Sequence, residues 1–338
     1  MIKHYGFEYP PVGLISTIER LNLPEDFVFY ILDPFAGQHL PYEEITNTNK
    51  KNLFVIIHTH EGASHHWFDI LIPKLNNECD VPLDHIIVHS SCVYNPESTV
   101  GHIGSLVDYT STIVSRYENI TEVSIVDTTH HFVCLNRIYR WQRLQLVKML
   151  IDRDLCKFGR VSYTSPISVD DPYYKHFPMI VDSVDVSYDQ GHKILPEMSN
   201  ALVNVITESC YEPMPGSNIF ESHPQPGFTE KTYKSIMLGQ LPIFVAPYHT
   251  VQTYRDFGFD PFDDIIDHSY DLEQDPVKRL ELVTNQIEHI TKFDNLRQLR
   301  EKLLPRFQAN FQKLKYYSFN WDAEFSKWQQ YFSKFVAG

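Results

Sequence analysis

The sequence has no apolar run long enough to cross a bilayer, and its first six residues contain no apolar core of a signal peptide. We therefore expect neither a membrane span nor secretion. The five cysteines are an odd number, widely spaced and without a Cys-x-x-Cys pair. This argues against a disulfide framework and favours reduced thiols in a cytoplasmic protein.

Basic residues are also in the minority, because 29 Lys and Arg stand against 43 Asp and Glu, a formal net charge of −14. This balance argues against a protein whose whole surface binds nucleic acid, although a local basic groove stays compatible with it. Internal repeats and low-complexity tracts are absent as well. With 338 residues, 43% of them apolar, the chain can form two α/β domains with separate cores.

Short apolar runs that end in polar residues alternate with segments of helical spacing. Such runs are typical of buried parallel strands, and they lie at 27–32, 53–58, 85–89, 123–126, 132–135, 203–206 and 241–245. Helical spacing predicts helices at 64–75, 103–117, 141–154, 251–257, from Pro276 onward, after a cap at Asp294, and at 321–335. The alternation predicts an α/β fold with two doubly wound Rossmann-like domains facing a cleft, followed by C-terminal helices.

The most informative stretch is 228–245, which reads as a loop, a helix capped by Thr229 and a buried strand. The cap would direct free N–H groups and the positive helix end toward the space that Glu230 and Lys231 share. N–H groups and a lysine suit a diphosphate, and a carboxylate suits ribose hydroxyls. Thr-Glu-Lys at a helix start is also a common capping pattern, so the motif alone decides little.

The surrounding blocks give the motif more weight. Asn-Val-Ile-Thr-Glu-Ser at 204–209, Gly-Phe-Thr-Glu-Lys at 227–231 and Gly-Gln-Leu-Pro-Ile at 239–243 resemble the donor-binding region of the α1,3-fucosyltransferase family. The segment 132–136, with Arg143 seven residues further on, resembles that family's strand–Asn–Arg element. The resemblance covers about residues 130–250. A looser similarity, at 257–271, is to family-related transferases encoded by large viruses and phages.

The resemblance implies a GT-B glycosyltransferase with a nucleotide-diphosphate sugar donor, no other cofactor and no metal. By position, Lys231 and Arg143 would neutralise the diphosphate and Glu230 would hold the ribose. The remaining expected donor-site residues are Asn136, Arg137, Arg140, Glu208, Ser209 and Thr229. The chain departs from the family at 206–210, where the family has Phe and Asn, so a GDP-sugar and a UDP-sugar both stay open.

The same resemblance suggests how the chain is divided. We expect an acceptor-side domain at 1–130, a donor domain at 131–310, and a C-terminal helix at 311–338 that packs back on the first domain. Ligands of doubly wound sheets bind outside the carboxyl ends of the strands, here between the domains.

An inverting sugar transfer needs one carboxylate base, and cations at the leaving diphosphate if no metal is present. Glu61 is the first candidate for the base, because it follows the strand expected at 53–58. Asp33 and Asp127 follow the strands expected at 27–32 and 123–126. They are candidates for the same reason, because they too would lie at the carboxyl edge of a sheet. Each could instead be a helix cap or a turn residue.

Two other classes of function stay open. A metal-dependent hydrolase could use His58 and His60, with further candidate ligands at Glu61, His65, His66 and His130. A non-catalytic nucleotide-sugar binder would keep the donor motif without needing the base.

The acceptor is expected to be a glycan or a small molecule. A phage-type enzyme that glycosylates hydroxymethylated bases in DNA is the alternative, and it would act in a host cytoplasm. It would require a basic strip, for which the candidates are Lys292, Arg297, Arg300, Lys302, Arg306, Lys313 and Lys315. A solvated helix face explains these charges more simply.

Overall fold

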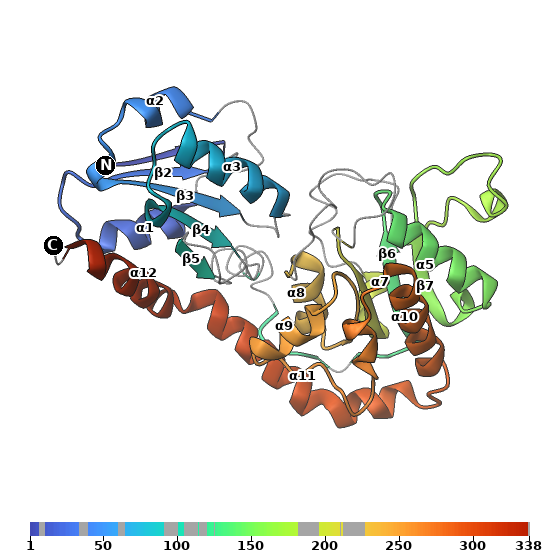
Figure 1. Cartoon of the computed structure of the whole chain (residues 1–338). Helices are drawn as coiled ribbons and strands as arrows, with labels where there is room; N and C mark the ends of the chain where they lie inside the picture. Colours follow the sequence, from blue (N-terminus) through green and yellow to red (C-terminus); the bar gives the residue numbers. More distant parts are fainter. Residues whose placement is uncertain are drawn as a thin grey trace. The chain divides into compact units, whose positions relative to one another are not determined.

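The computed structural model describes residues 1–6, 11–33, 40–59, 65–90, 101–104, 114, 120–124, 126–181, 196–209, 211 and 227–336. The chain forms two compact units (Figure 1). Unit 1 comprises Met1–Ser115, Pro213–Gly227 and Lys315–Gly338, and unit 2 comprises Arg116–Glu212 and Phe228–Leu314. Each unit contains a parallel sheet, which confirms the predicted α/β class.

Unit 1 is built on a five-stranded parallel sheet in the order β1-β2-β3-β4-β5. The strands are β1 Ile2–Tyr5, β2 Val28–Leu32, β3 Leu53–Thr59, β4 Ile86–Ser90 and β5 Gly101–Gly104. The three strands predicted in this region are confirmed as β2, β3 and β4. β1 and β5 have four residues each, too few for a period to show, and the sequence did not predict them.

The two faces of this sheet are covered by different helices, since successive side chains of a strand point to opposite faces. Phe29, Phe54 and Ile56 pack with α1 (Val12–Arg20) and with Trp328 and Phe332 of α12 (Trp321–Val336). The alternate residues pack against α2 (Tyr42–Asn47) and α3 (His65–Asn77). The C-terminal helix is therefore part of the core of unit 1 (Figure 1).

Unit 2 is built on a four-stranded parallel sheet in the order β7-β6-β8-β9. The strands are β6 His130–Asn136, β7 Gly159–Tyr163, β8 Ala201–Thr207 and β9 Leu241–Val245. The helices are α5 Trp141–Asp152, α7 Pro196–Ser199, α8 Glu230–Met237, α9 Thr250–Asp256, α10 Pro276–Ile290 and α11 Leu296–Phe319. The predicted strands at 132–135, 203–206 and 241–245 are confirmed, as are helices at 141–154 and 251–257.

The strand order of unit 2 reverses beside β6. From β6 the chain passes through α5 to β7 on one side, and then returns to place β8 on the other side of β6. The carboxyl ends of β6 and β8 therefore form the topological switch point, where open α/β sheets bind their ligands.

Three local predictions were wrong. The described residues of 121–126 form no strand; the backbone N–H of Val123 donates instead to Gln308 Oε1 (3.0 Å), so this apolar run marks a loop packed on α11. The helix expected at 103–117 is wrong at its start, where β5 runs to Gly104; of 105–117 only Val114 is described, and it is helical. The cap of α11 is Asn295, whose Oδ1 accepts from the N–H of Gln298 (3.0 Å), rather than Asp294.

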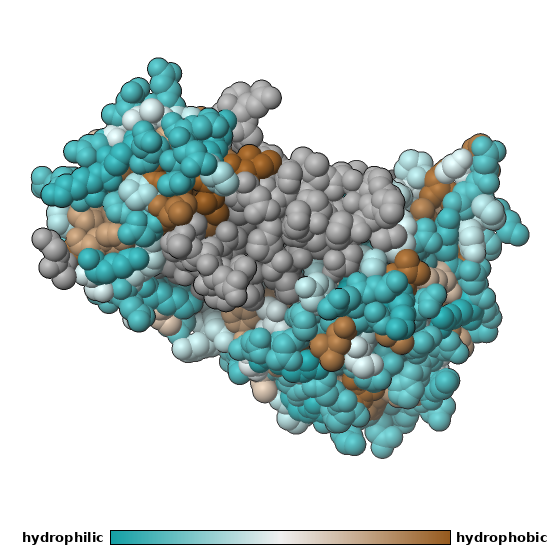
Figure 2. All heavy atoms as spheres, viewed as in Figure 1, coloured by the Kyte–Doolittle hydropathy of each residue, from teal (hydrophilic) through white to brown (hydrophobic). Residues whose placement is uncertain are grey.

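The distribution of polar and apolar residues at the surface is the one expected when each unit packs its apolar side chains in its core. In the view of Figure 2 the described surface is mostly hydrophilic, and apolar residues form separate patches. None of the helices in the described ranges combines the length and hydropathy that a membrane crossing requires.

Candidate functional site

The switch point of unit 2 is held together by side chains at the ends of its two strands. Asn136 is the last residue of β6 and Thr207 the last of β8. Thr207 Oγ1 donates to Asn136 Oδ1 over 2.7 Å, and each residue is 1% exposed. Asn136 thus lies at the predicted place and links the two strands.

Arg143 on α5 reaches the same point. Its Nη2 donates to the carbonyl oxygen of Thr207 (2.9 Å) and its Nη1 to that of Ile138 (3.1 Å). Burial, with the nearby charge of Arg140, lowers the pKa of Arg143. Both terminal nitrogens hold backbone carbonyls, so Arg143 positions the strand end and the loop. Its role in neutralising a diphosphate stays a prediction.

The amino end of α8 is already occupied by a carboxylate. Glu208, 3% exposed and directly after β8, accepts from Thr229 Oγ1 at Oε2 (2.7 Å). Its Oε1 accepts from Thr229 N (3.3 Å) and from Thr232 Oγ1 (3.2 Å). Thr229 caps the helix as predicted, with its Oγ1 accepting from Lys231 N (3.4 Å). The expectation of an open helix end is corrected, since Glu208 already meets the positive end of the helix.

Lys231 links this carboxylate to a second one. Its Nζ lies 3.0 Å from Glu230 Oε1, 3.6 Å from Glu208 Oε2 and 3.2 Å from Thr229 Oγ1. Its side chain is 25% exposed, against 4% for Glu208 and 10% for Glu230. Lys231 is therefore the group in this cluster that a ligand reaches first.

Lys234 follows Lys231 by three residues, on the same face of α8. It is buried, and its pKa is lowered to about 8: burial is the main cause, Glu230 acts against it, and the charges of Lys231 and Arg137 add to it. The sequence interpretation missed Lys234, although the spacing of three from Lys231 was a usable signal.

The loop after β6 adds two arginines. Arg140 Nε donates to the carbonyl oxygen of Ser209 (3.2 Å), and the carbonyl oxygen of Arg137 accepts from Thr164 and Ser165. The predicted donor-site residues therefore gather at one sheet edge. Among the described residues, five cationic side chains meet two carboxylates there, and these groups are Arg137, Arg140, Arg143, Lys231, Lys234, Glu208 and Glu230. The result is a local positive excess in an acidic chain.

The three predicted bases differ in their placement. Asp33 directly follows β2, at the carboxyl edge of the first sheet, and its N–H donates to Tyr5 O (3.0 Å). Asp127 is exposed and precedes β6, so it lies at the amino edge of the second sheet, opposite the switch point. The strand that motivated it does not form. Glu61 lies outside the described residues.

The histidines proposed as metal ligands have other partners where they are described. His58 Nδ1 lies 2.7 Å from His89 Nδ1, and His89 Nε2 lies 3.0 Å from Glu324 Oε1 on α12. His130 belongs to unit 2 and contacts Thr129 (2.8 Å). His60, and the side chains of His65 and His66, lie outside the description. Within the described ranges, no three His, Cys, Asp or Glu side chains are grouped to hold a metal ion.

Of the basic strip predicted for a DNA acceptor, Lys292, Arg297 and Lys302 are exposed, Arg306, Lys313 and Lys315 are half-buried, and Arg300 is buried. Arg300 is 1% exposed and donates to the carbonyl oxygens of Ser199 (3.2 Å) and Ala201 (3.1 Å). Arg306 pairs with Asp260 and Asp264, and Arg297 pairs with Glu301. Arg297, Arg300 and Arg306 thus have partners within unit 2, whereas Lys292 and Lys302 are exposed on it.

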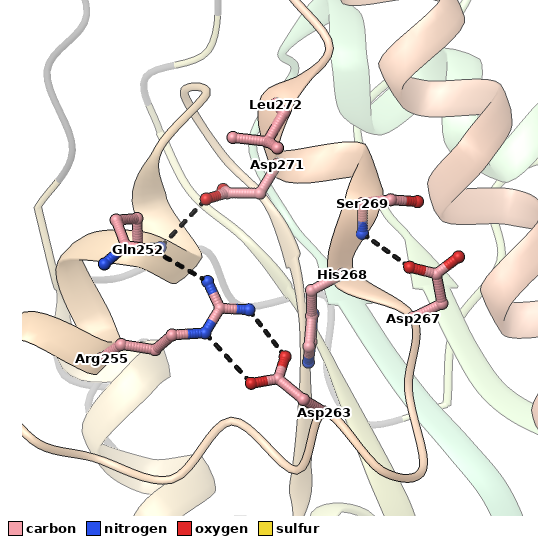
Figure 3. Close-up of a pocket in the computed structure, with 8 residues that line it drawn as sticks. All are labelled: Gln252, Arg255, Asp263, Asp267, His268, Ser269, Asp271 and Leu272. Atoms are coloured by element: carbon pink, nitrogen blue, oxygen red, sulfur yellow. Dashed lines mark hydrogen bonds and ion pairs between the residues drawn. The ribbon is translucent and has the colours of Figure 1, made fainter.

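A pocket of about 440 Å³ lies beside α9 (Figure 3). Arg255 makes two hydrogen bonds to Asp263, 3.1 and 2.6 Å. Asp271 accepts from the N–H groups of Val251 (2.9 Å) and Gln252 (3.0 Å). None of the predicted donor-site residues lines this pocket, so we take the switch point as the candidate site.

Comparison with known proteins gives a distant likeness. No protein-family model matches the sequence, and no curated protein matches it. Among solved structures, the DNA-modifying enzyme β-glucosyltransferase, determined with and without uridine diphosphoglucose, is similar at 10% identity and a TM-score of 0.41. The match covers 100% of this chain and 99% of that one. We therefore interpret the site from its own geometry.

Proposed function

We propose that the chain is a glycosyltransferase that moves a sugar from a nucleotide-diphosphate sugar to a hydroxyl of a glycan or small molecule. The reaction would invert the anomeric centre and require no metal ion. The observation that carries this proposal is the excess of cationic side chains at the switch point of unit 2, with Lys231 accessible beside the start of α8.

The chemistry of the cluster fits a diphosphate leaving group. Negative charge builds on the diphosphate as the sugar departs, and fixed cations in a water-poor site stabilise it strongly. Lys231 would move from Glu230 to a phosphate oxygen. Glu230 would then be available to accept hydrogen bonds from ribose hydroxyls.

The sequence resemblance supports the same assignment. Its three blocks correspond to β8 with its carboxyl end, the start of α8, and β9, and the strand–Asn–Arg element corresponds to β6 and α5. Residues far apart in the sequence thus meet at one sheet edge. A fucosyltransferase-like donor site is part of the proposal, and the base of the nucleotide stays open between guanine and uracil.

The base would come from the carboxyl edge of the first sheet, and Asp33 and Glu61 are the candidates. Removing a general base typically slows the chemical step about 10²- to 10⁴-fold. We expect Asp33→Asn or Glu61→Gln to lose transfer while keeping donor binding. Retention of transfer in both would contradict an acid–base role for either and favour a different carboxylate.

The deciding experiment is a thermal-shift panel with UDP, GDP, other nucleoside diphosphates and their sugars. A ligand present at 100 times its Kd stabilises the folded state by about 2.7 kcal/mol, so a selective rise in Tm with one base is expected. A response to none would reject the proposal. The responding donor is then assayed for transfer to glycans, small alcohols and hydroxymethylated DNA; binding without transfer or hydrolysis would identify a non-catalytic binder.

A further inference from the structure

A row of polar side chains crosses the last rung of the second sheet. Asn136 of β6 is the register partner of Tyr163 of β7. The β6–β8 register pairs Val133 with Asn204, which places Asn136 beside Thr207 three residues later. Register partners in parallel strands point to the same face. Tyr163, Asn136 and Thr207 therefore lie side by side on one face at the switch point.

Two members of this row form a hydrogen bond with each other, and the third takes no part in it. Asn136 and Thr207 share a hydrogen bond of 2.7 Å. Tyr163 is 0% exposed, and within the described part of the chain its hydroxyl has no hydrogen-bond partner. Arg143 is 5% exposed, and its Nε is likewise without an acceptor among the described residues.

These two donors belong to the same neighbourhood. Arg143 donates through its other nitrogens to the end of β8, and its charge acts on the Tyr163 hydroxyl. The ring of Tyr163 is held edge-on against Phe177, with centroids 5.2 Å apart, and its backbone pairs with Met179. A buried donor without an acceptor is unfavourable, and folded proteins rarely keep one unless a ligand or an ordered water supplies the acceptor.

We infer that the Tyr163 hydroxyl and Arg143 Nε bind an anionic oxygen of the donor diphosphate at the inner end of the site. This inference rests on the proposed function. It adds β7 to the strands that build the donor site, through a residue outside the motif blocks that carry the family resemblance. An O–H donor and a guanidinium N–H donor are suited to a phosphate oxygen, which accepts several hydrogen bonds.

The test is Tyr163→Phe, which removes the hydroxyl and keeps the ring. Affinities for UDP, GDP and inorganic pyrophosphate are measured by calorimetry, with Tm recorded for each protein. A hydrogen bond to a charged oxygen is worth about a tenfold change in affinity or more, so the Kd of the diphosphate that binds wild type should rise by that factor. Tm without ligand should stay level or rise, since the variant loses an unpaired donor.

The matched control is Tyr254→Phe, another buried tyrosine of unit 2, which should leave these affinities unchanged.

The outcomes separate the two claims. If wild type binds a diphosphate and Tyr163→Phe binds it equally well, the inference is wrong and the hydroxyl serves at most an ordered water. If wild type binds none of the three probes, the proposed function fails and the inference fails with it. Equal weakening in Tyr254→Phe would also overturn the inference, because the effect would then come from altered packing.

Discussion

Glu208 determines how the start of α8 is presented. Its carboxylate receives hydrogen bonds from the backbone and side chain of Thr229 and from Thr232, so three donors converge on one buried residue. A diphosphate that binds here would find the positive end of the helix already paired with the Glu208 carboxylate. Binding would therefore depend on the surrounding cations more than on bare N–H groups.

Replacing Glu208 by Gln should destabilise unit 2. The variant loses the charge at the helix start and turns an amide NH₂ toward the Thr229 donors. We expect the free energy of unfolding to fall by about 1–3 kcal/mol, measured by urea denaturation. Glu281→Gln, at an exposed position of α10, is the matched control. Equal stability of both variants would contradict the capping role.

Lys231→Ala tests the accessible cation. The variant removes a charge of the cluster whose side chain is 25% exposed, and the affinity for the selected nucleoside diphosphate should fall about tenfold or more. Calorimetry measures the effect. Lys278→Ala, a more exposed lysine of the same unit paired with Glu273, should bind as wild type does. Unchanged affinity in Lys231→Ala would remove the proposed phosphate contact.

At the level of elements, α12 is the piece of chain that completes unit 1. Trp328 and Phe332 enter the core beneath Phe29 and Phe54. Tyr331 Oη donates to the carbonyl oxygen of Asp84 (2.7 Å), before β4. Replacing Phe332 by Ala should therefore lower the free energy of unfolding by about 3–5 kcal/mol. Tyr316→Ala, an exposed aromatic near the end of α11, should change it little. Urea denaturation of both variants provides the comparison.

The contact of Glu324 with His89 makes the docking of α12 sensitive to acid. Burial alone raises the pKa of Glu324, but the His89 hydrogen bond, the charge of Lys327 and the Trp328 hydrogen bond outweigh it and hold the pKa below its usual value. A depressed carboxylate pKa adds stability above the unfolded pKa of about 4.3, and that stability is lost as pH falls through the folded pKa.

Glu324→Gln should therefore lose stability at neutral pH and show a flatter fall of Tm on acidification. Glu19→Gln, exposed on α1, should keep the wild-type profile. Tm is measured from pH 7 downward for the three proteins. Parallel curves for wild type and Glu324→Gln would show that the carboxylate is not linked to docking.

The elements that could be predicted are those with a strong local signal. Apolar runs predicted β2, β3, β4, β6, β8 and β9, and capping chemistry predicted the start of α8. The short strands β1 and β5 have no such signal. The spacing of the motifs predicted that Asn136, Arg143, Thr229 and Lys231 lie together at one edge of the second sheet. The hydrogen bonds of Arg143 to carbonyl oxygens, and the burial of Tyr163, follow from strand register and packing, which no local pattern encodes.

At the scale of the whole molecule, charge is distributed unevenly. Among the described residues, cations exceed carboxylates at the switch point, although the whole chain has a formal net charge of −14. A local positive field of this kind would attract the diphosphate of the proposed donor.

Turnover should survive chelation, because arginine and lysine side chains are proposed to stabilise the leaving group. Initial rates are compared with and without EDTA, and then after addition of Mg²⁺ or Mn²⁺. Full loss of activity in EDTA with recovery on adding metal would contradict stabilisation of the leaving group by arginine and lysine alone. It would support a metal-assisted mechanism instead.

The two facing imidazole rings, His58 and His89, can share only one hydrogen between their Nδ1 atoms. When His89 is neutral and donates through Nε2 to Glu324, its Nδ1 has a lone pair, so the hydrogen must belong to His58. The tautomers at the ends of β3 and β4 are thus selected by a residue 235 positions further along the chain. Without a hydrogen-bond acceptor at position 324 that selection is lost, and the ring pair at the ends of β3 and β4 can exchange tautomers.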